Sequence, residues 1–244
     1  MTLKRFKGII TAALTVFVVA ACFFLPDTVA DIQDRQTIGN LNVKDSSSIS
    51  IETNPEMTLP ERLNLISISN STSVLVKNGK KLNITTSLDR AIAELNRFSG
   101  DDAPWAADFT VDLHESLLII DSDDPSTNML AWRFVLTDSS GQTITLVIDD
   151  ATGTIIQLIY KLNQRVVIVP EKNAGLYAEF YETAATLCRL MTGYYGVTVT
   201  LAEFELLGSL GFYKAELWES GTATPMFGIV QSDGFSINDR HSPS

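Results

Sequence analysis

Apolar and polar residues alternate in three short runs between Trp132 and Tyr160, and turn residues separate the runs. Every second residue of a run is apolar, which gives each predicted strand one apolar face. Those faces comprise Trp132, Phe134 and Leu136, then Ile144, Leu146 and Ile148, then Ile156, Leu158 and Tyr160. Gly141 and Gly153 occupy the two connections, where a turn favours the positive φ that glycine adopts readily. The pattern predicts three antiparallel strands joined by tight turns.

Upstream of these strands the apolar spacing is helical between Ser87, the expected cap, and Gly100, the expected end. The residues of that stripe are Leu88, Ala91, Ile92, Leu95 and Phe98. Alternation then predicts a further strand from Phe109, on which His114 points outward. One helix of this length is able to cover the apolar face of such a sheet.

The same order of elements recurs in the second half of the chain. A helical stripe between Leu176 and Met191 precedes alternating segments near residues 197–201, 213–217, 226–230 and 235–238. The chain is therefore predicted to be an α+β protein with two tandem modules, each a helix plus an antiparallel sheet, at residues 57–165 and 166–238. One continuous α+β domain is the alternative.

Two further local signals lie at the start of the first module. Thr58, Pro60 and Glu61 together are typical of a helix N-terminus with a capping box. Asn78 and Gly79 form a strong hairpin-turn signal between two short apolar runs. The sequence thus predicts a short helix followed by a hairpin.

The N-terminal 30 residues are predicted to be a transmembrane or signal segment. Lys4, Arg5 and Lys7 precede an uncharged run from Ile9 to Leu25, and no acidic residue occurs before residue 27. This charge order places the N-terminus in the cytoplasm and the rest of the chain outside the membrane. Three outcomes remain open: an uncleaved single-pass anchor in the cell membrane, acylation at Cys22 as a lipoprotein, and cleavage followed by secretion.

Composition separates the flanking segments from the folded part. Residues 31–56 are rich in Asp, Asn and Ser and are predicted to be a flexible tether, and residues 239–244 a polar tail. All 29 acidic residues but only 15 of the 18 Lys and Arg lie beyond residue 26, so that part carries a net charge of −14. Such a charge argues against nucleic acid as a partner.

The segment from residue 87 to residue 161 resembles the PepSY family, a small extracytoplasmic module of bacterial membrane proteins and protease propeptides, and is also cystatin-like. The resemblance rests on the aromatic strand at Trp132 and on the turn, in which Asp149, Thr152 and Gly153 match the family pattern. Asp150 stands where the family usually has Ala. The resemblance implies a membrane-associated module that regulates a protease or an envelope protein.

No motif of the sequence indicates catalysis or a bound metal or cofactor. The chain has two histidines and lacks the metal-binding, phosphate-binding and nucleophile motifs that are recognisable from local sequence. Asp149, Asp150, Thr152 and Gly153 are predicted to form a structural turn. A pair of carboxylates among Glu203, Glu205, Glu216 and Glu219 is the basis of the alternative function, a carboxylate-dependent hydrolase.

Trp105 is the expected partner-binding aromatic residue, because it lies between Pro104 and Ala106 in a predicted loop. The expected function is therefore that of a non-enzymatic, membrane-tethered extracytoplasmic protein. We expect it to bind a protease or envelope protein by adding a partner strand to its sheet.

Overall fold

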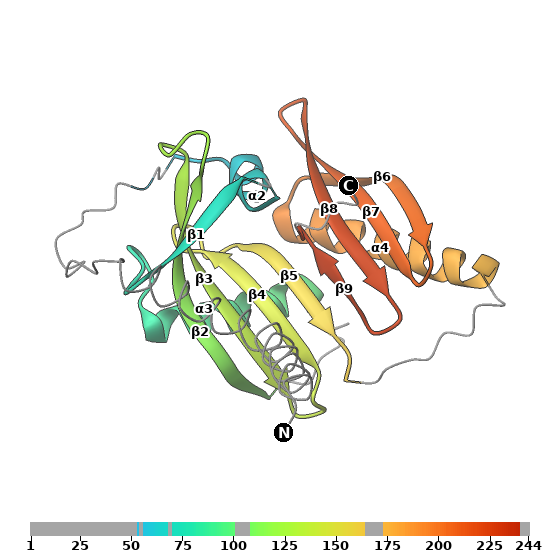
Figure 1. Ribbon diagram of the computed structural model, residues 1–244, viewed down its shortest axis with the longest axis horizontal. Coiled ribbons are helices and arrows are strands. Elements are labelled where there is room, and N and C mark those ends of the chain that lie inside the picture. Colours follow the sequence, from blue (N-terminus) through green and yellow to red (C-terminus); the bar gives the residue numbers. More distant parts are fainter. Residues whose placement is uncertain (1–52, 54–55, 68–69, 101–107, 164–172, 240–244) are drawn as a thin grey trace, which may run out of the picture. The chain divides into compact units, whose positions relative to one another are not determined.

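The computed structural model describes residues 53, 56–67, 70–100, 108–163 and 173–239. Three helices and nine strands are formed by these described residues (Figure 1). In chain order they are α2 (Leu59–Ser67), β1 (Ser71–Val76), α3 (Ile84–Ser99), β2 (Phe109–Asp121), β3 (Asn128–Asp138), β4 (Thr143–Asp149), β5 (Ile155–Lys161), α4 (Asn173–Tyr195), β6 (Thr198–Leu207), β7 (Leu210–Glu219), β8 (Thr222–Gln231) and β9 (Gly234–Ile237).

All nine strands belong to one antiparallel sheet with the order β1-β2-β3-β4-β5-β9-β8-β7-β6. The two halves of the chain meet where β5 pairs with β9, with Tyr160 opposite Phe235. The predicted fold of two tandem helix-plus-sheet modules is therefore wrong. Each half alone would leave β5 or β9 as an edge strand, and pairing the two edges satisfies the backbone groups of both.

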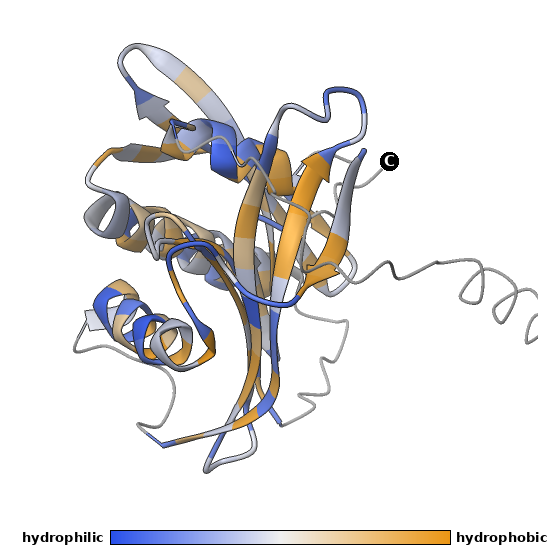
Figure 2. Ribbon diagram, turned by 90° about the vertical axis from the view of Figure 1, so that its left-hand side faces the viewer, coloured by the Kyte–Doolittle hydropathy of each residue, from blue (hydrophilic) through white to orange (hydrophobic). Residues whose placement is uncertain are grey.

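Helices α3 and α4 lie on the same side of this sheet (Figure 2). Helix α3 contacts β2 and β5, α4 contacts β6, β7 and β8, and the two helices contact each other. The ring of Phe98 in α3 packs edge-on against the ring of Tyr194 in α4, with centroids 5.4 Å apart. The helices thus form a second layer that crosses the junction between the two halves.

Helix α3 begins earlier than the sequence predicts. Asn83 is the N-cap, and its side chain accepts hydrogen bonds from the backbone N–H groups of Thr85 and Thr86. The hydroxyl of Thr86 accepts one in return from the Asn83 N–H, which completes a capping box. Ser87, the predicted cap, is instead fully buried inside the helix.

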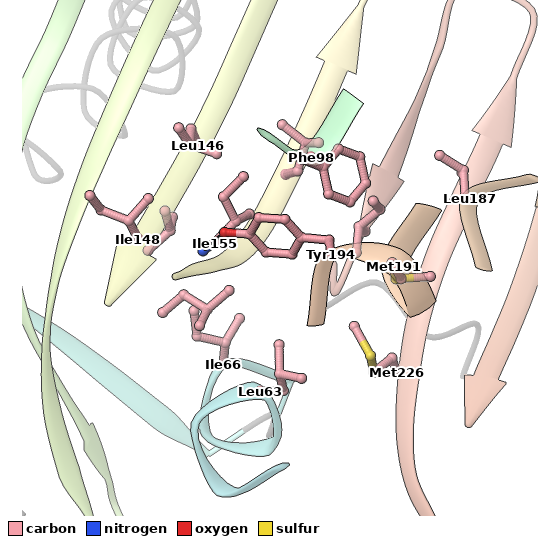
Figure 3. Close-up of a cluster of buried hydrophobic side chains, with 14 of the residues drawn as sticks. Leu63, Ile66, Phe98, Leu146, Ile148, Ile155, Leu187, Met191, Tyr194 and Met226 are labelled. Carbon is pink, nitrogen blue, oxygen red and sulfur yellow. Dashed lines mark hydrogen bonds between the residues drawn. The ribbon is translucent and has the colours of Figure 1, made fainter. Parts of the chain in front are cut away.

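One continuous hydrophobic cluster joins both halves of the chain. Figure 3 shows Leu63 and Ile66 of α2 below Ile155 of β5. The ring of Tyr194 in α4 lies next to Ile155, and Met191 of the same helix lies to its right. Because these residues share a single core, neither half buries its apolar face by itself. The described residues, from 53 to 239, accordingly belong to one compact unit.

Among the described residues, no helix is long and apolar enough to cross a membrane. The predicted transmembrane helix therefore has no counterpart among α2, α3 and α4. The N-terminal segment 1–30, nearly all of the tether 31–56 and the tail from residue 240 lie outside the described residues.

Candidate functional site

Asp149, the first residue of the predicted turn, is fully buried and pairs with Arg62 of α2. Arg62 Nη1 lies 2.6 Å from Asp149 Oδ1, and the two side chains are 4% and 1% exposed. The other carboxylate oxygen accepts hydrogen bonds from the N–H and the hydroxyl of Thr152, at 2.7 and 2.6 Å. Gly153 follows with a φ of +74°, the conformation that a glycine tolerates best. The turn thus positions a carboxylate that anchors α2 to the sheet.

Asp150 is buried as well and accepts four hydrogen bonds. Its Oδ2 accepts from the backbone N–H groups of Lys80 and Lys81, at 2.8 and 2.7 Å. Its Oδ1 accepts from the N–H of Leu82 and from the indole Nε1–H of Trp132, at 3.0 and 2.8 Å. Both oxygens are therefore engaged with donors that lie far away in sequence.

The segment from residue 77 to residue 83 wraps around Asp150 and does not form the predicted hairpin. Strand β1 pairs with β2, from Ser71 opposite Asp121 to Val76 opposite Ser116. A Cβ at Gly79 would collide with Asp150 Oδ1 and would lie 2.7 Å from Trp132 Nε1. The glycine that indicated a hairpin turn is thus required by the close approach of a buried carboxylate.

A second buried carboxylate, Glu94, anchors the junction of α3 and α4. It accepts charge-assisted bonds from Arg90 at 2.8 Å and Arg97 at 2.7 Å, and the hydroxyl of Tyr194 donates to it at 2.6 Å. Burial, followed by the hydrogen bond to Glu94, raises the pKa of Tyr194 to about 12. The same hydroxyl accepts from the N–H of Ile155 at 2.9 Å, which links both helices to β5.

These three carboxylates are occupied by neighbouring donors, which leaves little capacity for a bound cation. No group of three or more His, Cys, Asp or Glu side chains within the described ranges is arranged to hold a metal ion. The pocket beside Asp149 and Asp150 has a volume of about 190 Å³ and is lined also by Arg62, Lys80 and Lys81. Asp149 and Asp150 thus bind donors of the protein itself.

The acidic residues of the hydrolase alternative lie on β6 and β7. Lys214 separates two of them, with Nζ 2.9 Å from Glu203 and 4.0 Å from Glu216. The side chain of Glu203 is 71% exposed. Glu219 lies at the rim of a wide pocket that also includes Glu61 of α2. Glu203 and Glu216 therefore pair with a lysine at the surface of the sheet, where water screens their charges.

His114 faces α3, which reverses the outward orientation that alternation predicts. A β-bulge between Val111 and Leu113 shifts the register of β2 by one residue, so His114 lies opposite Phe134. Its Nε2 is 2.9 Å from the Ser87 hydroxyl oxygen. The centroid of its ring lies 4.6 Å from that of Phe134 and 5.2 Å from that of Trp132. Burial lowers the pKa of His114 below its ordinary value.

This environment predicts a pH dependence of stability. Since the unfolded chain binds a proton more readily than folded His114 does, stability should fall as the pH drops through the ordinary histidine value of 6.5. Thermal melts between pH 7.5 and pH 5.5 should show a declining midpoint for the wild type and a flatter profile for His114→Gln. His241→Gln is the matched control, and an equal flattening in that variant would contradict the assignment.

The two outer strands of the sheet, β1 and β6, form its edges. Strand β1 exposes Val74 by 47% and Leu75 by 66%, and β6 exposes Leu207 by 46%. Beside β6, the residues Tyr177 and Tyr181 of α4 are also exposed, by 44% and 43%. These edges are the candidate interaction surfaces of the described residues.

The tyrosines were not singled out by the sequence pattern, because both fit the helical stripe between Leu176 and Met191. A signal was nevertheless present: the apolar residues at 176, 177, 180 and 181 occupy more than one face of the helix.

Trp105 and Cys22, which the sequence did single out, lie outside the described residues. Cys188 is buried, and desolvation raises its pKa to about 11.

The chain matches no family model, no curated protein and no solved structure. Its resemblance to PepSY and cystatin-like modules stays a prediction.

Proposed function

We propose that this chain is a non-catalytic binding or regulatory protein that acts outside the cytoplasm. It would bind a protease or an envelope protein by pairing a strand of that partner with an open edge of its own sheet. Strand addition supplies affinity through backbone hydrogen bonds and specificity through alternate side chains.

The observation that carries this proposal is the open sheet. Among the described residues, strand β1 pairs with β2 on one side only, and β6 pairs with β7 on one side only. Strand β1 contains no charged residue, and its Leu75 is the most exposed of the large apolar side chains in the described part of the chain. Charged residues normally protect an edge strand against unspecific pairing, so the uncharged β1 is open to a partner strand, and β6, with Glu203 and Glu205, is open to one of complementary charge.

Site-specific photo-crosslinking tests the proposal in cells that produce the full-length chain. A photoreactive amino acid would replace Leu75 on β1 or Leu207 on β6. Ile84 is the matched control, since it is 61% exposed at the start of α3 and belongs to no strand. The expected result is one protein captured from an edge position and not from Ile84.

Two further measurements complete the test. The purified partner should slow hydrogen exchange of the backbone amides in the edge strand that captured it. Equal capture at Ile84, or turnover of a peptide, glycan or ester that Glu203→Gln abolishes, would contradict the proposal. The extracytoplasmic location requires the folded part to be cleaved by protease added outside intact cells, and protection from that protease would contradict it.

A further inference from the structure

The two faces of β6 differ in chemistry along its second half. Phe204 lies opposite Tyr213 and Leu206 opposite Gly211, on the face that α4 covers. Glu203 lies opposite Lys214 and Glu205 opposite Phe212, on the other face. A strand added beside β6 would place its own side chains alternately on these two faces. The edge therefore presents an apolar row on one side and an acidic row on the other.

The apolar row continues into an exposed aromatic cluster. Tyr177 and Tyr181 of α4 are stacked with ring centroids 6.1 Å apart, and both pack edge-on against Phe204, at 5.1 and 5.7 Å. Gly211 makes this packing possible, since a Cβ there would lie 2.8 Å from Phe204 Cζ. We name Tyr177, Tyr181 and Phe204 the aromatic shelf. Its two tyrosines offer rigid apolar area of the kind that dominates protein interfaces.

On the face of β6 and β7 that carries the acidic row, carboxylate side chains outnumber the one lysine, Lys214. Lys214 neutralises Glu203 at 2.9 Å and lies 4.0 Å from Glu216. No ion pair joins Glu205 to any of the described residues. A second copy of β6 would bring Glu205 near another acidic row, and this repulsion disfavours pairing between two identical edges. The charge instead fits a partner strand with basic residues.

A β-bulge between Leu201 and Glu203 sets the length of the docking edge. The regular part after the bulge runs from Glu203 to Leu207, about 17 Å at the usual rise of about 3.4 Å per residue. We infer that this edge binds an extended segment of a partner protein in which basic and apolar residues alternate, with the apolar side chains on the aromatic shelf. The inference rests on the proposed function and specifies the edge and the partner chemistry.

Synthetic peptides test the inference with the full-length protein. The probe is a ten-residue peptide that alternates Lys with Val, compared with a peptide in which Glu replaces Lys and with one that has the Lys and Val residues in separate blocks. The alternating Lys peptide should bind most tightly and should slow hydrogen exchange of the amides in residues 203–207. The block peptide carries the same charge and controls for unspecific attraction to an acidic protein.

Matched variants separate the two rows. Glu205→Lys should lower the affinity for the Lys peptide at least tenfold and raise the affinity for the Glu peptide. Unfolding of the edge strand would not raise the affinity for either peptide. Combined Tyr177→Ala and Tyr181→Ala should weaken binding of the Lys peptide by about tenfold or more, and a thermal melt should still show cooperative unfolding, because both residues are partly exposed. Ile84→Lys at the start of α3, which belongs to no strand, should leave binding unchanged.

The outcomes distinguish this inference from the broader proposal. Slower hydrogen exchange at residues 71–76 in place of residues 203–207 would overturn the assignment to β6. It would still agree with the broader proposal of strand addition. Equal binding of the alternating and block peptides, or no response to Glu205→Lys, would overturn the partner chemistry. Failure of every peptide to protect β6, while cellular cross-linking at Leu207 succeeds, would likewise overturn only the inference.

Discussion

Asp150→Ala is expected to destabilise the protein by about 3–5 kcal/mol, since it removes the shared acceptor of one buried and three part-buried donors. Three backbone N–H groups, of Lys80, Lys81 and Leu82, and the indole N–H of Trp132 lose their common partner. The free energy of unfolding from urea titration measures the loss.

Two variants define the cause of this effect. Asp150→Asn keeps the shape of the side chain but turns one acceptor into a donor that faces two other donors, so it should also destabilise, by about 2 kcal/mol or more. Asp124→Ala removes an exposed aspartate that accepts bonds from its own loop, and it should leave the urea midpoint nearly unchanged. A loss below about 1 kcal/mol for Asp150→Ala would show that water replaces the carboxylate.

Arg62→Met is expected to cost about 3–5 kcal/mol, because it leaves the Asp149 carboxylate buried without its counter-charge. The substitution keeps much of the side-chain volume but removes the guanidinium, whose Nε also donates to the Met57 carbonyl at 2.9 Å. Urea unfolding of the variant measures the loss.

Exposed and buried ion pairs of the same type can be compared within this chain. Arg189 and Glu182 in α4 lie 3.0 Å apart with both side chains 69% exposed, so Arg189→Met should cost only about 0–1 kcal/mol. Adding Asp149→Asn to Arg62→Met should recover part of the loss, since no buried charge then remains. A cost for Arg62→Met equal to that of Arg189→Met would contradict the structural role of the pair.

Local patterns determined much of the secondary structure. The alternation from Trp132 to Tyr160 and the glycine at position 153 give β3, β4 and β5 with the expected turns, because side-chain period and turn conformation depend on adjacent residues. The same holds for the helical stripes of α3 and α4. The predicted roles of Trp105 and Cys22 concern segments outside the described residues.

The tertiary structure decided what pairs with what. The union of both halves into one sheet depends on the pairing of β5 with β9, in which Tyr160 of the first half lies opposite Phe235 of the second half. The β-bulge in β2 turns His114 toward α3. Hydrogen bonds from the backbone of residues 80–82 to Asp150 take the place of the predicted hairpin. Strand partners, bulges and buried acceptors depend on distant residues, so their positions follow from the packing of the whole chain and not from local periodicity.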